Sequence, residues 1–351
     1  MIPAELSRTV LRAVRRAVDE GALGGSVAVP EHVAVQRPRP GGRGDYASSV
    51  ALKLAGPAGL PPRDVAEILR DRVAGATGIE RVDITGPGFL NFTLAPDARD
   101  DIVTTVLREG PAHGHTTALA GRTVRVSPGG PGRPGGPGGP GGDPRTRTVA
   151  ESVVALLRAQ GADASLAPDG ERIPVAPLGP GERDPFERYG PDAARWALLR
   201  PAPHDRPHPG PHLLVQDESN PLFRVRHAHA RARALLRNAA DLGVPGEWTG
   251  RAAVAGAADA AALLDVLADH AAALESAARH RAPDRLARHL EAVADAFLAF
   301  IHPTTAPFSL LPLGDEKPSA AHRSRLALAE AAGTVLAGGL SLLGISAPEH
   351  L

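Results

Sequence analysis

The sequence of 351 residues contains no cysteine. This absence excludes disulfide bonds, zinc sites built on thiolates and a thiol nucleophile. The sequence also lacks any apolar run near the roughly 20 residues that a membrane-spanning helix needs. Its first residues predict a charged amphipathic helix without the long apolar core of a signal peptide. We therefore expect a cytoplasmic protein with no membrane partner.

Lysine is almost absent as well. Of 39 basic residues only Lys53 and Lys317 are lysines, and Asp and Glu also total 39, so the formal net charge is zero. A site for a polyanion must then be a local patch and not a field of the whole chain. Because arginine is the default surface cation of this sequence, the number of arginines alone indicates no function.

The most informative stretch is a basic amphipathic helix predicted from Asn220 to Gly243. Asn220 suits the N-cap, Pro221 the first helical position and Gly243 the position just past the end. At about 100° per residue, one arc of the helix is apolar enough to face a core. The residues on this arc are Leu222, Val225, His229, Ala232, Leu236 and Ala239.

Two basic stripes flank that arc. One carries Arg226, Arg233 and Arg237, and the other carries Arg224, His227 and Arg231, with Phe223 between the stripes. An aromatic ring set between guanidinium groups is suited to a splayed RNA base, and the five arginines offer up to five phosphate contacts. The alternative is that the arginine stems cover the edges of the core and Phe223 packs on a neighbouring helix.

The first 115 residues predict a small sheet packed with helices. Asp45 is expected to cap a helix over 46–55, and residues 79–95 predict two strands joined by a glycine-rich turn. Alternation places Phe92 towards the helices, and Phe89 and Asn91 on the open face of the sheet. Phe89 can then stack a base and Asn91 can hydrogen-bond its edge. The alternative is an edge aromatic covered by the first helix.

The remaining chain divides in two. Within 116–188 the sequence predicts a strand at 121–127, a Gly/Pro-rich connector at 128–142, a helix at 145–160 and irregular structure over 161–188. From 189 to 351 it predicts a helical bundle, with Asp284 and Ser319 as helix caps and a single helix over 251–280. Three histidines, at 204, 208 and 212, lie in a proline-rich loop, where we expect no metal site.

Several motifs at both ends resemble the arginyl-tRNA synthetases. VQRPRPGGRGDYASSVALKLAG resembles their E-R-P-x-x-x-x-x-G-D-Y-A-S/T-N segment, and GPGFLNFTLA their G-P-G-[FY]-[LI]-N strand. YGPDAARWALLR resembles their G-x-D-A-[AL]-R motif, ESNPLFRVRHAHARARALLR their basic helix, and SLLGISAPEHL their extreme C-terminus. RTRTVAESVVALLRAQGADA resembles the helix that follows their H-[IVM]-G-H signature.

The resemblance implies a domain order and a fold class. It predicts an arginyl-tRNA synthetase N-terminal-like domain at 1–115, a remnant of the catalytic domain at 116–188 and a helical anticodon-binding-like (DALR) domain at 189–351. The fold expected is an α+β N-terminal domain followed by a mainly α helical bundle, without a complete Rossmann domain. Asp192 and Arg195, in the G-x-D-A-[AL]-R motif, are expected to form an ion pair.

The sequence lacks most of the residues that amino-acid activation uses in this family. Adenylate formation needs donors aimed at the ATP phosphates, which this family supplies from two histidines and a lysine-bearing K-M-S-K loop. Here no histidine lies between His115 and His204, and no lysine lies between Lys53 and Lys317. We therefore assign no catalytic residue and expect no metal and no cofactor.

The resemblance also assigns roles to the candidate residues. In the family, the residues matching Phe89 and Asn91 contact the tRNA elbow, and the basic helix lies against the anticodon arm. Where the family has Tyr, Gln and Tyr, this chain has Arg224, Arg226 and His227. Exchanging aromatic and amide groups for cations predicts retained phosphate affinity and weaker base discrimination.

Three hypotheses follow. The leading one is a tRNA-binding, synthetase-like protein that does not aminoacylate by itself, with tRNA and either a full-length synthetase or another tRNA-using enzyme as partners. The alternative is an arginine–tRNA ligase that works with a catalytic partner, in which case ATP is a cofactor. The third is a protein-interaction module whose RNA face is vestigial.

Overall fold

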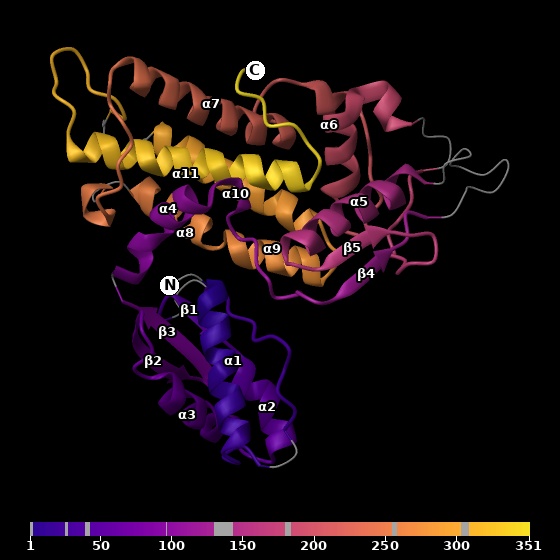
Figure 1. Cartoon of the computed structure of the whole chain (residues 1–351), viewed down its shortest axis with the longest axis vertical. Helices are drawn as coiled ribbons and strands as arrows, with labels where there is room; N and C mark the ends of the chain where they lie inside the picture. The colour runs from indigo at the N-terminus through magenta and orange to yellow at the C-terminus, as the bar shows by residue number, and fades with distance from the viewer. Residues whose placement is uncertain are drawn as a thin grey trace. The chain divides into compact units, whose positions relative to one another are not determined.

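Two units make up the chain in the computed structural model, Met1–Ile102 and Val103–Leu351, and each is described by itself (Figure 1). The structure describes residues 3–24, 27–38, 43–95, 97–129, 143–179, 184–254, 258–302 and 309–351. Helix α4 (Asp97–Glu109) contains the boundary between the units. None of the described helices is long and apolar enough to cross a bilayer.

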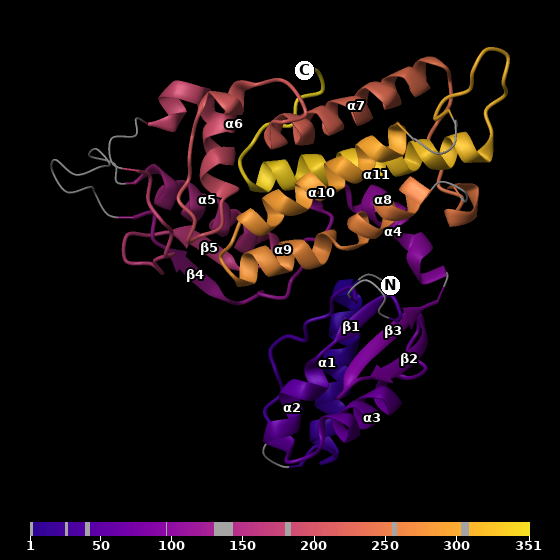
Figure 2. The ribbon, with the colours of Figure 1, turned by 180° about the vertical axis from the view of Figure 1, so that it is seen from behind.

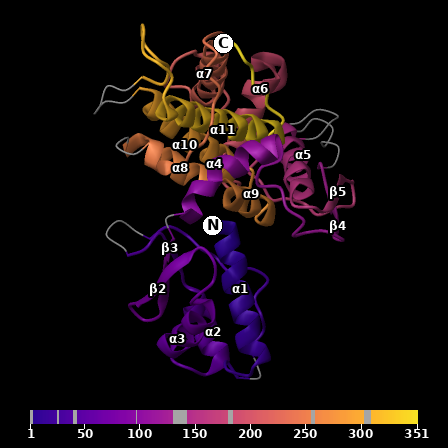
Figure 3. The same cartoon turned by 60° about the vertical axis from the view of Figure 1, so that its left-hand side comes forward.

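The first unit is a three-stranded antiparallel sheet packed with helices, as predicted. The elements are α1 (Pro3–Asp19), β1 (Tyr46–Ser48), α2 (Val50–Ala58), α3 (Pro62–Val73), β2 (Ile79–Thr85) and β3 (Phe89–Leu94). The strand order is β1-β3-β2, and the register pairs Val82 with Phe92. Leu90 and Phe92 are fully buried with Leu6, Val10 and Leu69 of the helices, which confirms the face predicted to meet them. Figure 3 shows this sheet beside α1.

Two turn residues of this unit have specific geometries. Gly88, in the β2–β3 turn, has φ 143°, and a Cβ there would lie 2.7 Å from the carbonyl oxygen of Pro62, so only glycine fits. The prediction that Asp45 caps a helix is wrong. Its Oδ2 accepts a hydrogen bond from Leu94 N at 2.8 Å, and α2 instead begins after Ser49. Asp45 therefore ties the β1 end to β3.

The second unit begins with a short β–α–β arrangement. Strands β4 (Thr123–Val126) and β5 (Asp163–Leu166) pair in parallel, and α5 (Pro144–Ala159) packs on β5 beside them (Figure 2). Strand β5 lies inside the stretch 161–188 that was predicted to be irregular, and this correction reflects a strand too short to carry a periodic signal. The predicted connector at 128–142 lies almost wholly outside the described residues.

The rest of the unit is helical, as predicted. Its elements are η1 (Gly110–Ala112), α6 (Pro185–Leu199), η2 (Pro211–Leu214), α7 (Pro221–Asp241), η3 (Arg251–Val254), α8 (Ala258–Ala268), α9 (His270–Arg279), α10 (Asp284–Ile301) and α11 (Ala320–Leu342). Helices α7, α10 and α11 pack against one another, with α7 and α11 side by side in Figures 1 and 2. Gly339 of α11 allows α10 to lie close to this helix, because a Cβ at position 339 would lie 2.5 Å from Leu290 Cδ2 of α10.

Helix boundaries follow local signals where these exist. Ser319 caps α11 as predicted, because its Oγ accepts a hydrogen bond from His322 N at 3.3 Å. Asp284 does not act as the predicted cap: Pro283 is the N-cap of α10, and Asp284 is a buried residue of the first turn. The single helix predicted over 251–280 is divided into η3, α8 and α9.

Candidate nucleic-acid interface

Helix α7 confirms the predicted ends of the basic helix. Asn220 Oδ1 accepts a hydrogen bond from Leu222 N at 3.1 Å, Pro221 is the first helical residue, and Gly243 follows the end with φ 66°. Of the predicted inward arc, Leu222, Val225, His229, Ala232 and Ala239 are buried, and Leu236 is half-buried. The helix therefore presents its two basic stripes at the edges of its packed face.

One stripe faces a segment near the end of the chain. We call Arg226, Arg233 and Arg237 the tail stripe, because Ser346–His350 lies along it. Arg233 Nη2 lies 2.8 Å from Glu349 Oε1, and Arg237 Nη1 lies 3.7 Å from Glu349 Oε2. These three cations thus already have protein partners.

The other stripe is less occupied. We call Arg224, His227 and Arg231 the open stripe. Arg224 Nε lies 3.3 Å from Asp295 Oδ1, whereas Arg231 is exposed and has no partner among the described residues. Burial lowers the pKa of His227, and the neighbouring Arg231 lowers it further, so both effects favour the neutral ring.

The ring of His227 has a different partner. It stacks on Phe223, with ring centroids 5.3 Å apart and an interplanar angle of 14°. Phe223 is half-buried and so does not project freely, but its ring lies next to a surface pocket. The stack sets the orientation of the aromatic face that the sequence singled out.

The pocket lies between α6, η2 and α7 and encloses about 250 Å³. Its walls include Tyr189, Phe223, Arg226 and Leu351, together with residues 190–193 and 213–216. Leu214 and Val215 leave an exposed apolar rim, while Arg226 supplies a cation. A pocket below the roughly 300–1,000 Å³ of drug-sized sites suits one planar ring system stacked on an aromatic side chain.

Two residues that line the pocket, Asp192 and Arg226, form an ion pair that was not predicted. Asp192 was expected to pair with Arg195, and this is wrong. Asp192 Oδ2 lies 3.7 Å from Arg226 Nη2, and its Oδ1 accepts a hydrogen bond from Ser346 N at 3.0 Å. Arg195 Nη2 instead lies 2.6 Å from Glu151 Oε2 of α5. Asp192 and Arg195 lie three residues apart on α6, but their side chains contact different helices.

In the first unit, the two candidate residues of β3 have different surroundings. Phe89 is 39% exposed, in agreement with a ring on the open face. Asn91 is only 4% exposed, so its predicted place on an open face is wrong. Its Nδ2 donates to Thr85 Oγ1 at 2.7 Å and to Phe89 O at 3.2 Å. Because both amide hydrogens are used inside the hairpin, Asn91 holds the strand end that carries Phe89.

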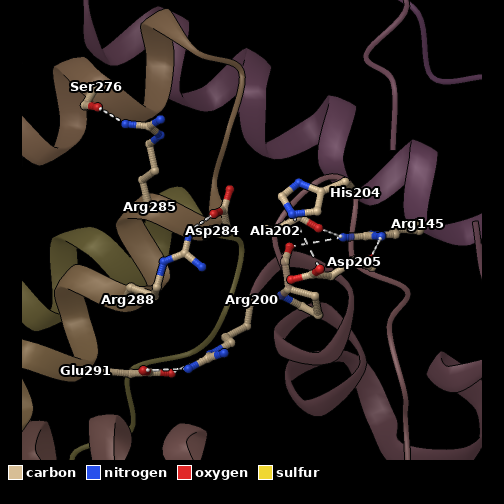
Figure 4. A network of polar contacts seen from close by, with 11 residues as sticks. Arg145, Arg200, Ala202, His204, Asp205, Ser276, Asp284, Arg285, Arg288 and Glu291 are labelled. Carbon is tan, nitrogen blue, oxygen red and sulfur yellow. Dashed lines mark hydrogen bonds and ion pairs between the residues drawn. The ribbon is translucent and has the colours of Figure 1, made fainter. Parts of the chain in front are cut away.

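The β–α–β part is fixed to the helices by a buried cation, Arg145 (Figure 4). Arg145 is 1% exposed, and its five N–H groups donate to five backbone carbonyls, those of Ala176, Leu198, Pro201, Ala202 and Asp205, at 2.6–3.1 Å. A guanidinium has five N–H donors, so none remains for a ligand. Arg145 is therefore a structural residue and not a phosphate donor.

The loop histidines do not gather into a site. His204, His208 and His212 are all exposed. Among the residues that the structure describes, no group of three or more histidine or carboxylate side chains could hold a metal ion. No local pattern in the sequence predicts the contacts of Glu349, Asp192 and Arg145, since their partners lie far away along the chain.

Comparison with known protein families gives two matches. Residues 4–94 match the arginyl tRNA synthetase N terminal domain, and residues 225–351 match the DALR anticodon binding domain. Most of the tail and open stripes lie inside the second match, whereas Phe223 and Arg224 lie just before it. The first match contains Phe89 and Asn91.

Curated relatives match over a part of their length. The arginine–tRNA ligase of Frankia alni is 52% identical over 127 residues, which are 36% of this chain and 22% of the relative. The arginine–tRNA ligase of Renibacterium salmoninarum is 39% identical over 163 residues, 46% of this chain and 29% of the relative. The chain therefore spans less than a third of the length of the curated relatives that it matches.

Solved structures share the fold. The arginyl-tRNA synthetase of Thermus thermophilus superposes with a TM-score of 0.72 at 14% identity, covering 100% of both chains. That of Plasmodium falciparum gives 0.64 at 8% identity, covering 99% of each. The chain thus contains segments that match the arginyl tRNA synthetase N terminal domain and the DALR anticodon binding domain, and it shares its fold with solved arginyl-tRNA synthetases. The described residues between the two matched segments form no complete Rossmann domain.

Proposed function

We propose that this protein binds tRNA without aminoacylating it by itself. The observation that carries the proposal is the pocket beside α7, in which an aromatic ring, a cation and an apolar rim meet, on a helix that also carries the exposed Arg231. Aromatic stacking combined with phosphate-binding cations is how proteins hold unpaired bases. We infer that Phe223 stacks one base, while Arg224 and Arg231 bind phosphates.

The first unit adds a second contact in this proposal. Phe89 offers an exposed ring on a strand whose end is held by the buried Asn91. Its role is stacking, and we assign Asn91 a positioning role instead of base recognition. The contacts of the two units differ in kind, since the first acts through one ring and the second through a ring together with cations.

The absence of aminoacylation is inferred from the residues between the two domains. No histidine or lysine lies between positions 116 and 203. The described parallel sheet has two strands, which do not form the crevice at a strand-order switch where α/β enzymes bind nucleotides. Two charged residues of this region are already engaged within the fold and leave no group for ATP. Asp143 Oδ2 caps α5, and all N–H groups of Arg145 donate to backbone carbonyls.

Fluorescence anisotropy with a tRNA transcript and an unrelated folded RNA of equal length tests this proposal. We expect tighter binding of tRNA, and Phe223→Ala should weaken it by about 1–3 kcal/mol, the usual contribution of one stacked base. Leu242→Ala is the matched control, because Leu242 is an exposed apolar residue at the far end of α7, outside the pocket. Equal affinity for the two RNAs, unchanged in Phe223→Ala, would favour the protein-interaction hypothesis.

Phe89→Ala is the corresponding test in the first unit. We expect a loss of about 1–3 kcal/mol in tRNA affinity with an unchanged salt dependence, because stacking neutralises no phosphate. An altered salt dependence would contradict a pure stacking role.

Catalysis is tested separately by arginine-dependent ATP–pyrophosphate exchange. We expect none from the purified chain, because the groups that bind ATP phosphates in the family have no counterpart here. Exchange that appears only when a second purified protein is added would support the alternative, a ligase that works with a catalytic partner.

A further inference from the structure

The segment Ser346–His350 is bound along the tail stripe of α7 by contacts at every turn. Arg226 Nη2 donates to Ser346 Oγ at 3.4 Å, and the Nδ1 of the buried His229 lies 3.0 Å from Pro348 O. Arg233 Nε donates to Glu349 Oε1 at 3.0 Å, and Arg237 Nη2 donates to Glu349 O at 3.4 Å. In Figures 1 and 2 this part of the chain runs beside α7.

The lengths of the two partners agree. Positions 226, 229, 233 and 237 fall on one side of a helix and span 11 residues, about 16 Å at 1.5 Å per residue. Positions 346 to 350 span about 13 Å if extended at 3.3 Å per residue. The segment therefore follows the helix in the same direction, with a contact at each turn, and it bends at Glu349.

Two carboxylates neutralise the tail stripe. Glu349 lies between Arg233 and Arg237, and Asp192 pairs with Arg226 at the other end. A carboxylate held by two guanidinium groups occupies the geometry in which arginines also bind phosphate. Three positive charges are thus opposed by two negative ones before any RNA arrives, whereas on the open stripe Arg231 has no such partner among the described residues.

The carboxylate of Glu349 can be replaced. The side chains of Arg233, Arg237 and Glu349 are 41%, 38% and 51% exposed. Ion pairs this exposed contribute only about 0–1 kcal/mol, because water screens them. A phosphate group with the same geometry and more charge can therefore take the position without disrupting the packed face of α7.

We propose that Ser346–His350 is a built-in competitor that occupies the phosphate-binding positions of the tail stripe, so that RNA must displace Glu349 to reach Arg233 and Arg237. The inference rests on the proposed function and adds regulation to the same site. Its consequence is a salt dependence of RNA binding weaker than five arginines would give, because wherever Glu349 keeps its place Arg233 and Arg237 neutralise no phosphate and release no counterion from the RNA. The open stripe makes the first contact, and the tail stripe joins when the segment moves away.

The test is Glu349→Gln, which keeps the shape of the side chain and removes its charge. RNA affinity should rise about two- to ten-fold at low salt, and the slope of log affinity against log salt should steepen by about one to two units. Glu275→Gln is the matched control, because it removes the same charge from an exposed Arg279 pair on α9. Thermal melts establish that both variants fold.

A double-mutant cycle locates the effect. Arg233→Gln should weaken RNA binding more in the Glu349→Gln background than in the wild type, because only there is Arg233 unoccupied beforehand. Amide hydrogen exchange supplies a direct readout: residues 346–350 should exchange faster in wild-type protein once RNA is bound. Equal effects of Arg233→Gln in both backgrounds, or unchanged exchange on RNA binding, would overturn the inference.

The probes are a tRNA transcript and a single-stranded RNA of mixed sequence. If Glu349→Gln gains affinity for both and neither is preferred, the competitor is supported and the tRNA proposal fails. If wild-type protein prefers tRNA but Glu349→Gln gains nothing, the competitor is refuted and the tRNA proposal stands. Absence of binding by both proteins refutes both.

Discussion

Arginine occurs in two contrasting settings within the second unit. Around Arg145 the guanidinium is buried, and each of its N–H groups donates to a backbone carbonyl. Along the tail stripe of α7 the side chains of Arg233 and Arg237 are more than a third exposed, and their partner is the carboxylate of Glu349. The residue type is the same, but its partners are not.

The difference shows which arginines a ligand can reach. Carbonyls of the folded backbone cannot leave, so a cation bound to five of them is a permanent part of the structure. A carboxylate on a segment at the surface can be exchanged for a phosphate. In a sequence with 39 basic residues and almost no lysine, the partner and the exposure of an arginine therefore indicate its role, and its presence does not.

The largest effect is expected from Arg145→Met, which keeps an unbranched apolar stem and removes all five donors. We expect a loss of about 4 kcal/mol or more in the free energy of unfolding, because five carbonyls lose a charged donor in a buried site. Urea unfolding followed by circular dichroism measures it. Arg147→Met is the control: Arg147 is 64% exposed on the same helix and pairs with Glu151, and its loss should cost less than about 0.5 kcal/mol.

The next effect is expected at acid pH, where a cluster of buried histidines should destabilise the folded protein. His270 stacks on His113, with ring centroids 5.7 Å apart, and its ring is tilted against that of His289 at 5.2 Å. His115 is close enough to lower the pKa of His270 further. His113 Nε2, His270 Nδ1 and His289 Nε2 are buried and have no hydrogen-bond partner in the part of the chain that the structure describes. The carboxylate in this cluster is that of Glu109, whose Oε2 lies 2.8 Å from His113 Nδ1.

The sign of the pH effect follows from this burial. It lowers the pKa of His289 from the ordinary 6.5 to about 4. Between these values the unfolded chain binds more protons than the folded one, so stability is complete above about pH 6.5 and falls as the pH drops towards 4. The loss from His289 alone should approach about 3 kcal/mol.

Unfolding free energies measured from pH 7 to pH 4 test this expectation. His289→Leu should flatten the pH dependence, because it removes a group that only the unfolded chain protonates in this range. His204→Gln, with a side chain 85% exposed, should leave it as it is. A wild-type protein that is equally stable at both ends of the range would contradict the prediction.

The smallest effect is expected from Asp192→Asn, which weakens the hold of α6 on Arg226 and Ser346. Both partners are partly exposed, so the unfolding free energy should change by about 1 kcal/mol or less. Amide exchange of Ser346 should nevertheless become faster, because Asp192 Oδ1 accepts its N–H. A cost like that of Arg145→Met would remove the contrast between fixed and exchangeable partners.

Local rules were sufficient for the helix that carries the candidate interface. Asn220, Pro221 and Gly243 set its ends, and the 3.6-residue period of its apolar side chains set the face that it buries. The same is true of β3, where alternation placed Leu90 and Phe92 in the core. Helix caps and hydrophobic periods depend on residues a few positions apart, so they can be recognised in a single sequence.

The burial of Asn91 could not be obtained in this way. Alternation gave the correct face of the strand, but the exposure of that face depends on what covers it, and Asn91 is covered and bonded to Thr85 across the hairpin. Strand β5 was missed for a similar reason, because four residues with one parallel partner carry no period of their own.

Local sequence patterns predicted the ends and the inward face of α7, the inward face of β3 and the position of two basic stripes on α7. The packing of the folded chain sets which of those cations are engaged, because their partners are remote: Glu349 is 116 residues from Arg233, and the carbonyls bound by Arg145 are 31 to 60 residues away. Propensity and periodicity are short-range properties of a chain, whereas the neighbour of a charge is set by how its helices pack. The difference between a structural arginine and a binding one therefore exists only in the folded molecule.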